Sequence, residues 1–315
     1  MPNDLSKSKF VLGCAQLGMR YGITNYNGKP NYLESQKILS ACSKNNVQFI
    51  DTAMEYGDSE EVIGKFFESN IKQRSISVIT KISPVKSLLS NIDPKFYQKV
   101  IFNMVQSSCF RLNVRKIDFL LVHSFEDLMF SNGVVLKILK SILQKGLVDS
   151  IGVSIQSEQE LEKALKFEDI KLIQLPFNIL DSRWDNYVKV IREIKKKRGL
   201  IIHARSIFLQ GLLLTNDHNK WKKATVDNPK EILESINRLV SDYKKNSIMQ
   251  LCIDYVKDQD WIDGLVIGVN SEKELLENFN YFYENLRSEK ITNWELDLPK
   301  LDSSTLNPSN WQTSE

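Results

Sequence analysis

The stretch FIDTAMEYGDSEE, residues 49–61, holds the end of one predicted strand, a turn and the beginning of a helix. Phe49 and Ile50 are apolar, Asp51 follows them, and a Tyr56-Gly57 turn leads into the acids that favour the first turn of a helix. An acid in this place either bends the next turn or belongs to a functional site. The rest of the chain decides between these two interpretations.

The same succession of apolar run and amphipathic helix recurs eight times along the chain. The predicted strands are residues 10–16, 48–53, 77–83, 117–124, 150–155, 172–178, 199–205 and 263–269. Helical patterns follow at residues 31–46, 59–69, 94–112, 131–145, 157–167, 184–198, 229–259 and 271–285. We expect Ser131 to cap the fourth helix, and Ser157 with Glu160 to form a capping box.

The predicted strands are mostly continuous apolar runs, which is typical of parallel strands buried on both faces. Eight β/α units therefore predict an α/β fold, a closed (β/α)8 TIM barrel. No G-x-G-x-x-G follows the first strand, which disfavours a Rossmann fold. No linker divides the chain, so we expect one domain over residues 1–315, with 209–228 and 297–315 as candidate lid elements.

The composition argues against several classes of partner. The 315 residues are 42% hydrophobic and 26% charged, and the net charge of +3 is too small to indicate nucleic acid or an anionic membrane. The N-terminus lacks the apolar core of a signal peptide, and no run approaches the ~20 apolar residues of a membrane span. We expect a cytoplasmic protein, a monomer or small homo-oligomer, without a metal site. Its four cysteines should be buried free thiols.

Polar residues stand at the ends of the predicted strands, where a parallel barrel carries its chemistry. They are Asp51 with Tyr56, Lys81, His123, Ser154, Gln174, Arg205 with Ser206, and Gly268 with Asn270. Each has an ordinary structural interpretation, and a lone histidine is more often a core residue than a catalytic one. Buried charges are costly unless paired, so an ion pair would explain Asp51 and Lys81. It leaves Tyr56 and His123 unexplained.

A catalytic interpretation accounts for four of these residues together. An ammonium near a phenol favours the phenolate, and Lys81 would act on Tyr56 in this way. Asp51 would hold Lys81 in place and charged, and a neutral His123 would orient a substrate oxygen. Such a tyrosine is suited to protonate a carbonyl that receives a hydride, or to remove the proton in the reverse oxidation.

With these residues the sequence resembles the aldo-keto reductase superfamily. The resemblance rests on D-T-A-x-x-Y-G-x-S-E at residues 51–60, on VITK ending at Lys81 and on LLVHS with His123, and it extends from about residue 10 to 285. It implies a (β/α)8 barrel that binds NADPH, with NADH as an alternative, and delivers hydride directly to an aldehyde or ketone. It makes Tyr56 the proton donor, tuned by Lys81 and Asp51, with His123 orienting the carbonyl.

The resemblance also implies the residues that would bind the cofactor. Ser154 and Gln174 would contact the nicotinamide carboxamide. Arg205 stands where many members place an aromatic residue on the nicotinamide, and a planar guanidinium can stack as well. The remaining implied contacts are with the pyrophosphate, by Ser206, Leu209 and Gly211, and with the adenosine phosphate, by Gly268, Asn270, Glu277 and Asn278.

Two further departures from the family pattern concern the cofactor. The serine-asparagine pair after the fifth strand is Ser154-Ile155 here, so one carboxamide ligand is lost or replaced. Glu274 stands where many members have a cation near the 2′-phosphate, and its carboxylate would repel that phosphate. NADPH therefore loses its expected advantage over NADH. Alternatively, Glu274 points to solvent.

Two segments, LGCAQLGMRYGITN at residues 12–25 and ARSIFLQGLLL at 204–214, are similar to a bacterial subgroup of this family. Some of its members are associated with deoxysugar or surface-polysaccharide pathways, which suggests a sugar or nucleotide-sugar carbonyl as substrate. The alternatives are a barrel that binds the cofactor without catalysis, as a sensor or regulatory subunit, and a sugar epimerase or lyase that uses the same four residues.

Overall fold

The chain forms a closed barrel of eight parallel strands in the computed structural model, which describes residues 9–70, 76–284, 294 and 296–311. Each strand pairs with the next in sequence, and β8 pairs back onto β1, which confirms the predicted (β/α)8 barrel. The strands are β1 (Lys9–Gly13), β2 (Phe49–Asp51), β3 (Ser77–Ile82), β4 (Ile117–Val122), β5 (Val148–Ser154), β6 (Ile170–Pro176), β7 (Ile201–Arg205) and β8 (Gly264–Gly268).

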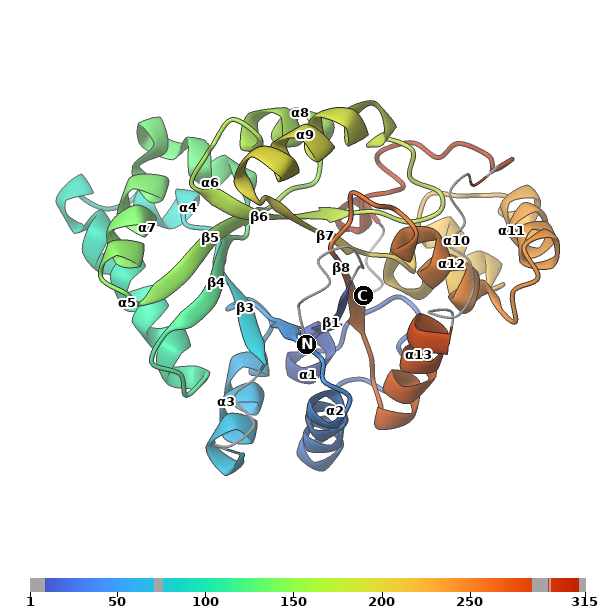
Figure 1. The fold of residues 1–315 in the computed structure, drawn as a ribbon, viewed down its shortest axis with the longest axis horizontal. Coiled ribbons are helices and arrows are strands. Elements are labelled where there is room, and N and C mark those ends of the chain that lie inside the picture. The colour runs from blue at the N-terminus through green and yellow to red at the C-terminus, as the bar shows by residue number, and fades with distance from the viewer. Residues whose placement is uncertain (1–8, 71–75, 285–293, 295, 312–315) are drawn as a thin grey trace.

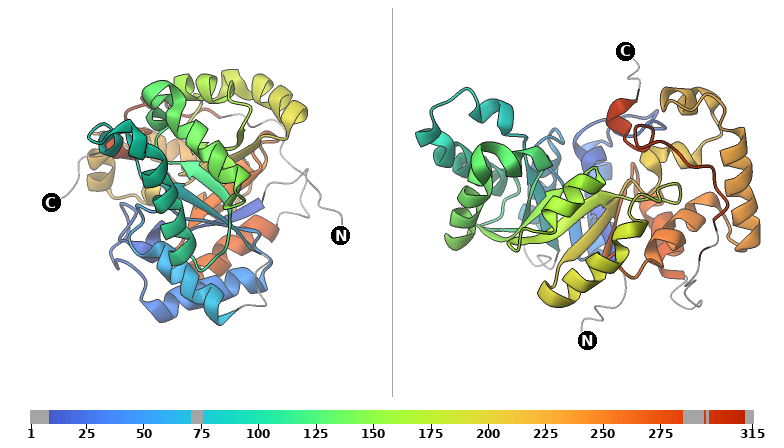
Figure 2. Two further views of the ribbon diagram at one scale, coloured as in Figure 1. Left: turned by 90° about the vertical axis from the view of Figure 1, so that its left-hand side faces the viewer. Right: turned by 90° about the horizontal axis from the view of Figure 1, so that it is seen from above.

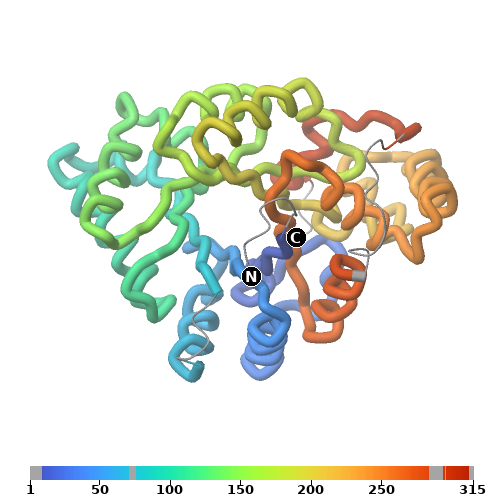
Figure 3. Tube along the Cα trace, viewed as in Figure 1, coloured from blue at the N-terminus to red at the C-terminus, as the bar shows by residue number. Residues whose placement is uncertain are grey.

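Helices surround the strands in chain order, so the colour runs once around the barrel in the ribbon and tube drawings (Figures 1 and 3). Near the ends of this ring, α2 lies beside α13 (Figure 1). The two further views show the helices on the outside of the strands (Figure 2). The helices are α1 (Ala15–Gly18), α2 (Tyr32–Lys44), α3 (Ser59–Ser69), α4 (Lys86–Leu89), α5 (Tyr97–Arg111), α6 (Phe125–Met129), α7 (Val134–Gln144), α8 (Glu158–Ala164), α9 (Val188–Arg198), α10 (His218–Lys223), α11 (Lys230–Asp242), α12 (Ile248–Lys257) and α13 (Glu272–Glu284).

The strands alternate between two apolar surroundings. On β3, for example, Val78 and Ile82 pack in the large cluster shared with the helices, whereas Ile79 belongs to a separate small cluster. That small cluster joins residues from β1, β3, β4 and β6, so it fills the barrel interior: Val11, Ile79, Leu121 and Leu172. Because side chains alternate along a strand, the next interior position of β3 belongs to Lys81.

Two helix predictions were wrong in their bounds. The pattern at 229–259 forms two helices, α11 and α12, because Lys244 adopts a left-handed backbone and Ser247 caps a new helix by accepting the Gln250 N–H. Ser131 does not cap the fourth predicted helix. It has a left-handed backbone (φ 45°) in the short helix η3 (Phe130–Gly133), and α7 begins after Gly133. The capping box of Ser157 and Glu160 is confirmed.

Several other segments have a definite structure. Residues 209–228 contain the short helix η5 (Leu209–Leu214) and α10, whose Trp221 is buried and donates its indole N–H to the Thr215 carbonyl. The tail packs Leu306 and Trp311 against the core, while residues 312–315 and the N-terminal residues 1–8 lie outside the described part. The four cysteines are buried and free, as predicted. No described helix has the length and hydropathy to cross a membrane.

His203 is an ionisable group inside the barrel wall. It lies on β7, its side chain is 1% exposed, and its ring meets Phe49 edge-on with 5.6 Å between centroids. Its Nδ1 has no hydrogen-bond partner among the described residues. Burial, reinforced by the charges of Lys9, Lys81 and Lys195, lowers the pKa of His203 from 6.5 to about 3. The folded protein therefore keeps this imidazole neutral.

This burial makes folding sensitive to acid. The folded pKa lies below the unfolded one, so the contribution of His203 to stability is complete above about pH 6.5 and is lost as the pH falls towards 3. We predict that His203→Gln removes part of this loss. In urea titrations at pH 7.5 and 4.5, wild type should lose on the order of 2–3 kcal/mol more unfolding free energy than the variant. Equal losses in the two proteins would contradict the assignment.

Candidate active site

Three polar side chains meet at interior positions of β2, β3 and β6. The Lys81 ammonium lies 2.6 Å from Asp51 Oδ1, and Gln174 Nε2 donates to Asp51 Oδ2 at 2.7 Å. Lys81 also donates to the Thr52 carbonyl at 3.0 Å. Both oxygens of Asp51 are thus engaged, and the structure brings together three residues that the sequence placed at strand ends.

The Lys81–Asp51 pair is buried, with 1% and 4% of the two side chains exposed. Burial by itself lowers the pKa of Lys81, but the charge of Asp51, the nearby Tyr56 and the Asp51 hydrogen bond together raise it above the ordinary value. Lys81 therefore stays charged inside the barrel. Its Nζ lies 5.1 Å from the centroid of the Tyr56 ring.

Tyr56 is positioned by a tight turn between β2 and α3. Its N–H donates to the Ala53 carbonyl and its own carbonyl accepts from the Ser59 N–H. The backbone of α1 lies directly against this turn, because a Cβ atom at Gly18 would overlap the Tyr56 carbonyl. Gly57 has a left-handed backbone (φ 55°), and a Cβ there would overlap the Gly18 carbonyl. Two glycines in contact therefore fix the backbone that carries Tyr56.

The Ser59-Glu60 end of the sequence motif has a structural role. Ser59 Oγ donates to the Cys14 carbonyl at 2.8 Å and accepts from the Thr52 hydroxyl. The buried Glu60 carboxylate accepts hydrogen bonds from residues on β3 and α5, namely Thr80, Ser108 and Arg111. The motif thus contains both Tyr56, which faces the cavity, and Ser59 and Glu60, whose hydrogen bonds anchor α3.

His123 follows β4 and stands beside Tyr56. The two rings meet edge-on with 5.9 Å between centroids. Burial, together with the positive charges of Lys81 and Arg205, lowers the pKa of His123 from 6.5 to about 3. The imidazole is therefore neutral at physiological pH, as its predicted role requires. Its Nδ1 is buried and has no hydrogen-bond partner among the described residues.

A cavity of about 320 Å³ opens beside Tyr56 at the C-terminal ends of the strands. Nine of the predicted site residues line it: Asp51, Tyr56, Gln174, Arg205, Ser206, Gly211, Gly268, Asn270 and Asn278. Five others do not line it: Lys81, His123, Ser154, Leu209 and Glu277. Glu277 is exposed on α13, and Leu209 is buried in the core.

The part of this cavity away from Tyr56 has features suited to an extended ligand. Ser206, Leu209, Gln210 and Gly211 have left-handed backbones, and turns of this kind present N–H groups to anions. Asn278 Oδ1 is buried and has no hydrogen-bond partner among the described residues, although its side chain lines the cavity. Glu274 also lines the cavity instead of pointing to solvent, and its carboxylate accepts the Asn270 N–H at 2.7 Å.

The segment between β1 and α2, which includes α1, supplies lining residues that the strand ends alone do not indicate. Gln16, Thr24 and Asn25 line the cavity. Asn25 Nδ2 donates to Asn270 Oδ1 at 2.9 Å, and the Ile23 N–H donates to the Gln210 carbonyl at 3.1 Å, so this segment bridges to the segments after β7 and β8. Gln16 lies three residues after the end of β1, so its position near a strand end could have indicated that it lines the cavity. Nothing in the sequence marks Asn25, because its contacts join residues 245 positions apart.

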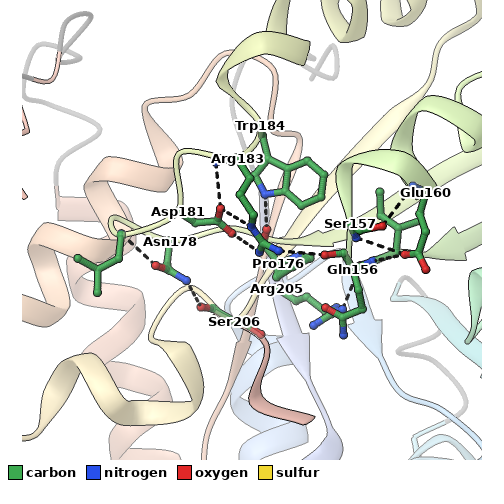
Figure 4. Close-up of polar contacts among 12 residues, drawn as sticks. Gln156, Ser157, Glu160, Pro176, Asn178, Asp181, Arg183, Trp184, Arg205 and Ser206 are labelled. Carbon is green, nitrogen blue, oxygen red and sulfur yellow. Dashed lines mark hydrogen bonds and ion pairs between the residues drawn. The ribbon is translucent and has the colours of Figure 1, made fainter. Parts of the chain in front are cut away.

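Hydrogen bonds also tie together the segments after β5, β6 and β7 (Figure 4). Arg183 forms a two-pronged ion pair with Asp181 and donates to the Gln156 carbonyl at 3.1 Å. Asn178 Nδ2 donates to the Ser206 carbonyl at 3.4 Å. Arg205 donates from Nη2 to the Ile155 carbonyl at 3.1 Å. These contacts hold one wall of the cavity in a fixed arrangement.

Comparisons with known proteins agree with this architecture. The sequence model described as "Aldo/keto reductase family" matches residues 9–296. Aldo-keto reductase str7 of Strobilurus tenacellus is 24% identical over 295 residues, covering 89% of this chain and 84% of the relative. D-arabinose 1-dehydrogenase of Saccharomyces cerevisiae is 28% identical over 159 residues, covering 49% and 44%. The holo form of aldo-keto reductase AKR11C1 from Bacillus halodurans has the same fold, with a TM-score of 0.65, 16% identity and coverage of 98% and 93%.

The buried ion pair generates a stability prediction. Asp51→Asn or Lys81→Met alone leaves the partner's charge buried, so each should cost about 3–5 kcal/mol of unfolding free energy. The double variant should cost clearly less than the sum of the two, as measured by a urea double-mutant cycle. The exposed pair Lys86–Glu126 is the control, and its Met and Gln variants should show little coupling. Additive losses at Asp51 and Lys81 would show that the pair is not a unit.

Proposed function

Because the chain belongs to the aldo/keto reductase family of oxidoreductases, whose members generally use NAD(P)H to reduce carbonyl groups, we propose that it reduces an aldehyde or ketone with Tyr56 as the proton donor. The observation that carries this proposal is the convergence of Tyr56, a charged Lys81 and a neutral His123 beside one cavity. A barrel that only binds the cofactor would not require this combination.

The three side chains divide the proton chemistry between them. The Lys81 ammonium, 5.1 Å from the Tyr56 ring, stabilises the negative charge that develops on the phenol oxygen as its proton leaves. Asp51 keeps that ammonium charged and fixed. A neutral His123 is able to donate a hydrogen bond to the substrate oxygen, so it orients the carbonyl while Tyr56 protonates it.

The remaining part of the cavity presents groups suited to a dinucleotide. When bound, the nicotinamide supplies the hydride. Ser206 and the left-handed turn ending at Gly211 would receive the pyrophosphate, and the unpartnered Asn278 Oδ1 offers an acceptor at the adenosine end. Gln174 lines the cavity and donates from Nε2 to Asp51, so its carbonyl oxygen would be the atom that accepts from a nicotinamide carboxamide.

The charge at the adenosine end favours NADH over NADPH in this proposal. Glu274 presents a carboxylate to the cavity, held by Asn270, and no lysine, arginine or histidine besides Arg205 lines the described cavity. A 2′-phosphate close to Glu274 would be repelled and would find no cation to offset it. The ribose hydroxyl of NADH instead offers a donor that a carboxylate accepts.

A sugar or another polyhydroxylated carbonyl compound is the substrate class we favour. Its support is the likeness to D-arabinose 1-dehydrogenase, which covers about half of the chain. Near Tyr56 the cavity wall carries the Tyr21 hydroxyl, which accepts a hydrogen bond from Gln210 Nε2 at 3.2 Å and suits a hydroxylated ligand.

We predict that Tyr56→Phe abolishes carbonyl reduction while the affinity for NADH changes little, because the variant loses only the phenolic proton. NADH oxidation with a panel of sugars and aromatic aldehydes measures turnover, and fluorescence quenching measures cofactor affinity. Tyr26→Phe is the matched control, since Tyr26 is 69% exposed and does not line the cavity. Wild-type turnover by the Tyr56 variant would show that the proton comes from elsewhere.

We predict that Glu274→Gln tightens NADPH binding roughly tenfold, because it removes the repulsion of the 2′-phosphate. Glutamine can still accept the Asn270 N–H, so NADH binding should stay within about twofold of wild type. Glu272→Gln, which removes the same charge from the first turn of α13 without lining the cavity, is the control. An unchanged ratio of the two affinities in the Glu274 variant would refute this assignment.

A further inference from the structure

Arg205 is a cation without an ionic partner in the reactive part of the cavity. It is the last residue of β7, at an interior position of the barrel, and it lines the cavity together with Tyr56 and Tyr21. The one hydrogen bond that its guanidinium makes within the described residues is to the Ile155 carbonyl, and no described carboxylate lies within ion-pair distance of it. A guanidinium has five N–H donors, so most of its donor capacity stays unused.

The acids near Arg205 are already committed to other cations. Asp51 is held by Lys81 and Gln174 through both of its oxygens. Asp181 forms its two-pronged pair with Arg183. Burial lowers the pKa of the Arg205 guanidinium, and the nearby Tyr21, Tyr56 and Asp51 offset this effect only in part. The reactive part of the cavity therefore carries one uncompensated positive charge.

The direction of Arg205 separates it from the segment suited to the pyrophosphate. Its side chain extends towards Gln156 and the end of β5, whereas Ser206 and Asn178 lie on the other side of it (Figure 4). The Ile155 carbonyl holds Nη2 in this direction. A ligand anion that meets the guanidinium would thus be a neighbour of Tyr56 and not of the turn at Gly211.

Resting on the proposed reduction at Tyr56, we propose that the substrate is a carbonyl compound that carries a carboxylate, and that Arg205 binds this carboxylate. A guanidinium matches a carboxylate through two parallel hydrogen bonds, which would also fix the orientation of the carbonyl. The single positive charge suits a monoanion. A phosphate dianion would call for further cations, and the described cavity lining contains none besides Arg205.

The arrangement also explains selection by charge. Lys81 stabilises the negative charge that develops on the Tyr56 oxygen. It does not line the cavity and is therefore unavailable to a substrate anion. Arg205 is therefore the group that binds a substrate carboxylate. A neutral carbonyl compound of the same shape leaves the guanidinium desolvated and unpaired. Discrimination against such a compound arises from that unpaired charge.

The test compares 4-carboxybenzaldehyde with its neutral methyl ester as substrates, using NADH and the full chain. Wild type should prefer the carboxylate in kcat/KM, and Arg205→Met should reduce this preference roughly 100-fold. Arg205→Lys, which keeps the charge but not the paired hydrogen bonds, should retain part of the preference. Arg192→Met removes the same charge from an exposed ion pair on α9 and should leave the preference unchanged.

Calorimetry with benzoate and benzamide, which are not reduced, detects the anion site without catalysis. Benzoate should bind the NADH complex of wild type and not that of Arg205→Met, while circular dichroism confirms that the variant is folded. If neither aldehyde is reduced but benzoate binding depends on Arg205, the proposed reduction fails and the carboxylate site stands. If wild type shows no preference for the carboxylate and no benzoate binding, the inference is overturned. It is also overturned if Arg205→Met weakens NADH binding and leaves the substrate preference unchanged.

Discussion

The rest of the site depends on the ion pair between Lys81 and Asp51. An ammonium in the interior of a barrel is tolerated only with a partner of opposite charge, and the partner has to come from a neighbouring strand at nearly the same height. Asp51 meets this condition on β2, next to β3. The pair then fixes where the Tyr56 turn must start, since Asp51 is the last residue of β2, and it places a permanent positive charge 5.1 Å from the Tyr56 ring.

Burial and that charge together determine the protonation state of the neighbouring His123. His123 is half-buried near Lys81 and Arg205, so protonating it would add a third cation to one small volume. The imidazole stays neutral and is free to donate a hydrogen bond. These residues are thus linked by electrostatics: the Asp51 carboxylate keeps the Lys81 ammonium charged, that ammonium lies beside the Tyr56 ring, and burial with the charges of Lys81 and Arg205 keeps the His123 imidazole neutral. Removing any one of them changes what the others are able to do.

The sequence was informative where the physics is local or periodic. Eight apolar runs with eight helical patterns were enough to predict a closed barrel. The alternation of side chains along β3 explains why Lys81, two positions after the interior residue Ile79, also points into the barrel. Local caps were less certain, because Ser131 has the residue type of a cap but a left-handed backbone. Contacts between distant loops could not be predicted: Asn25 reaches Asn270, and Glu274 turns into the cavity because Asn270 holds its carboxylate. Both depend on how loops after β1 and β8 meet, which no periodicity encodes.

Two departures from the family pattern, at the ends of β5 and β7, meet in space. Ile155 stands where the resemblance implies an asparagine, and its side chain is fully buried, so it offers only its carbonyl to the site. Arg205 stands where an aromatic ring is common, and its Nη2 uses that carbonyl. The Ile155 side chain packs in the large core cluster, so the contact with Arg205 is made by the backbone of residue 155 alone. The carbonyl after β5 thereby fixes the guanidinium at the end of β7, and a cationic group becomes part of the cavity wall that Tyr56 also lines.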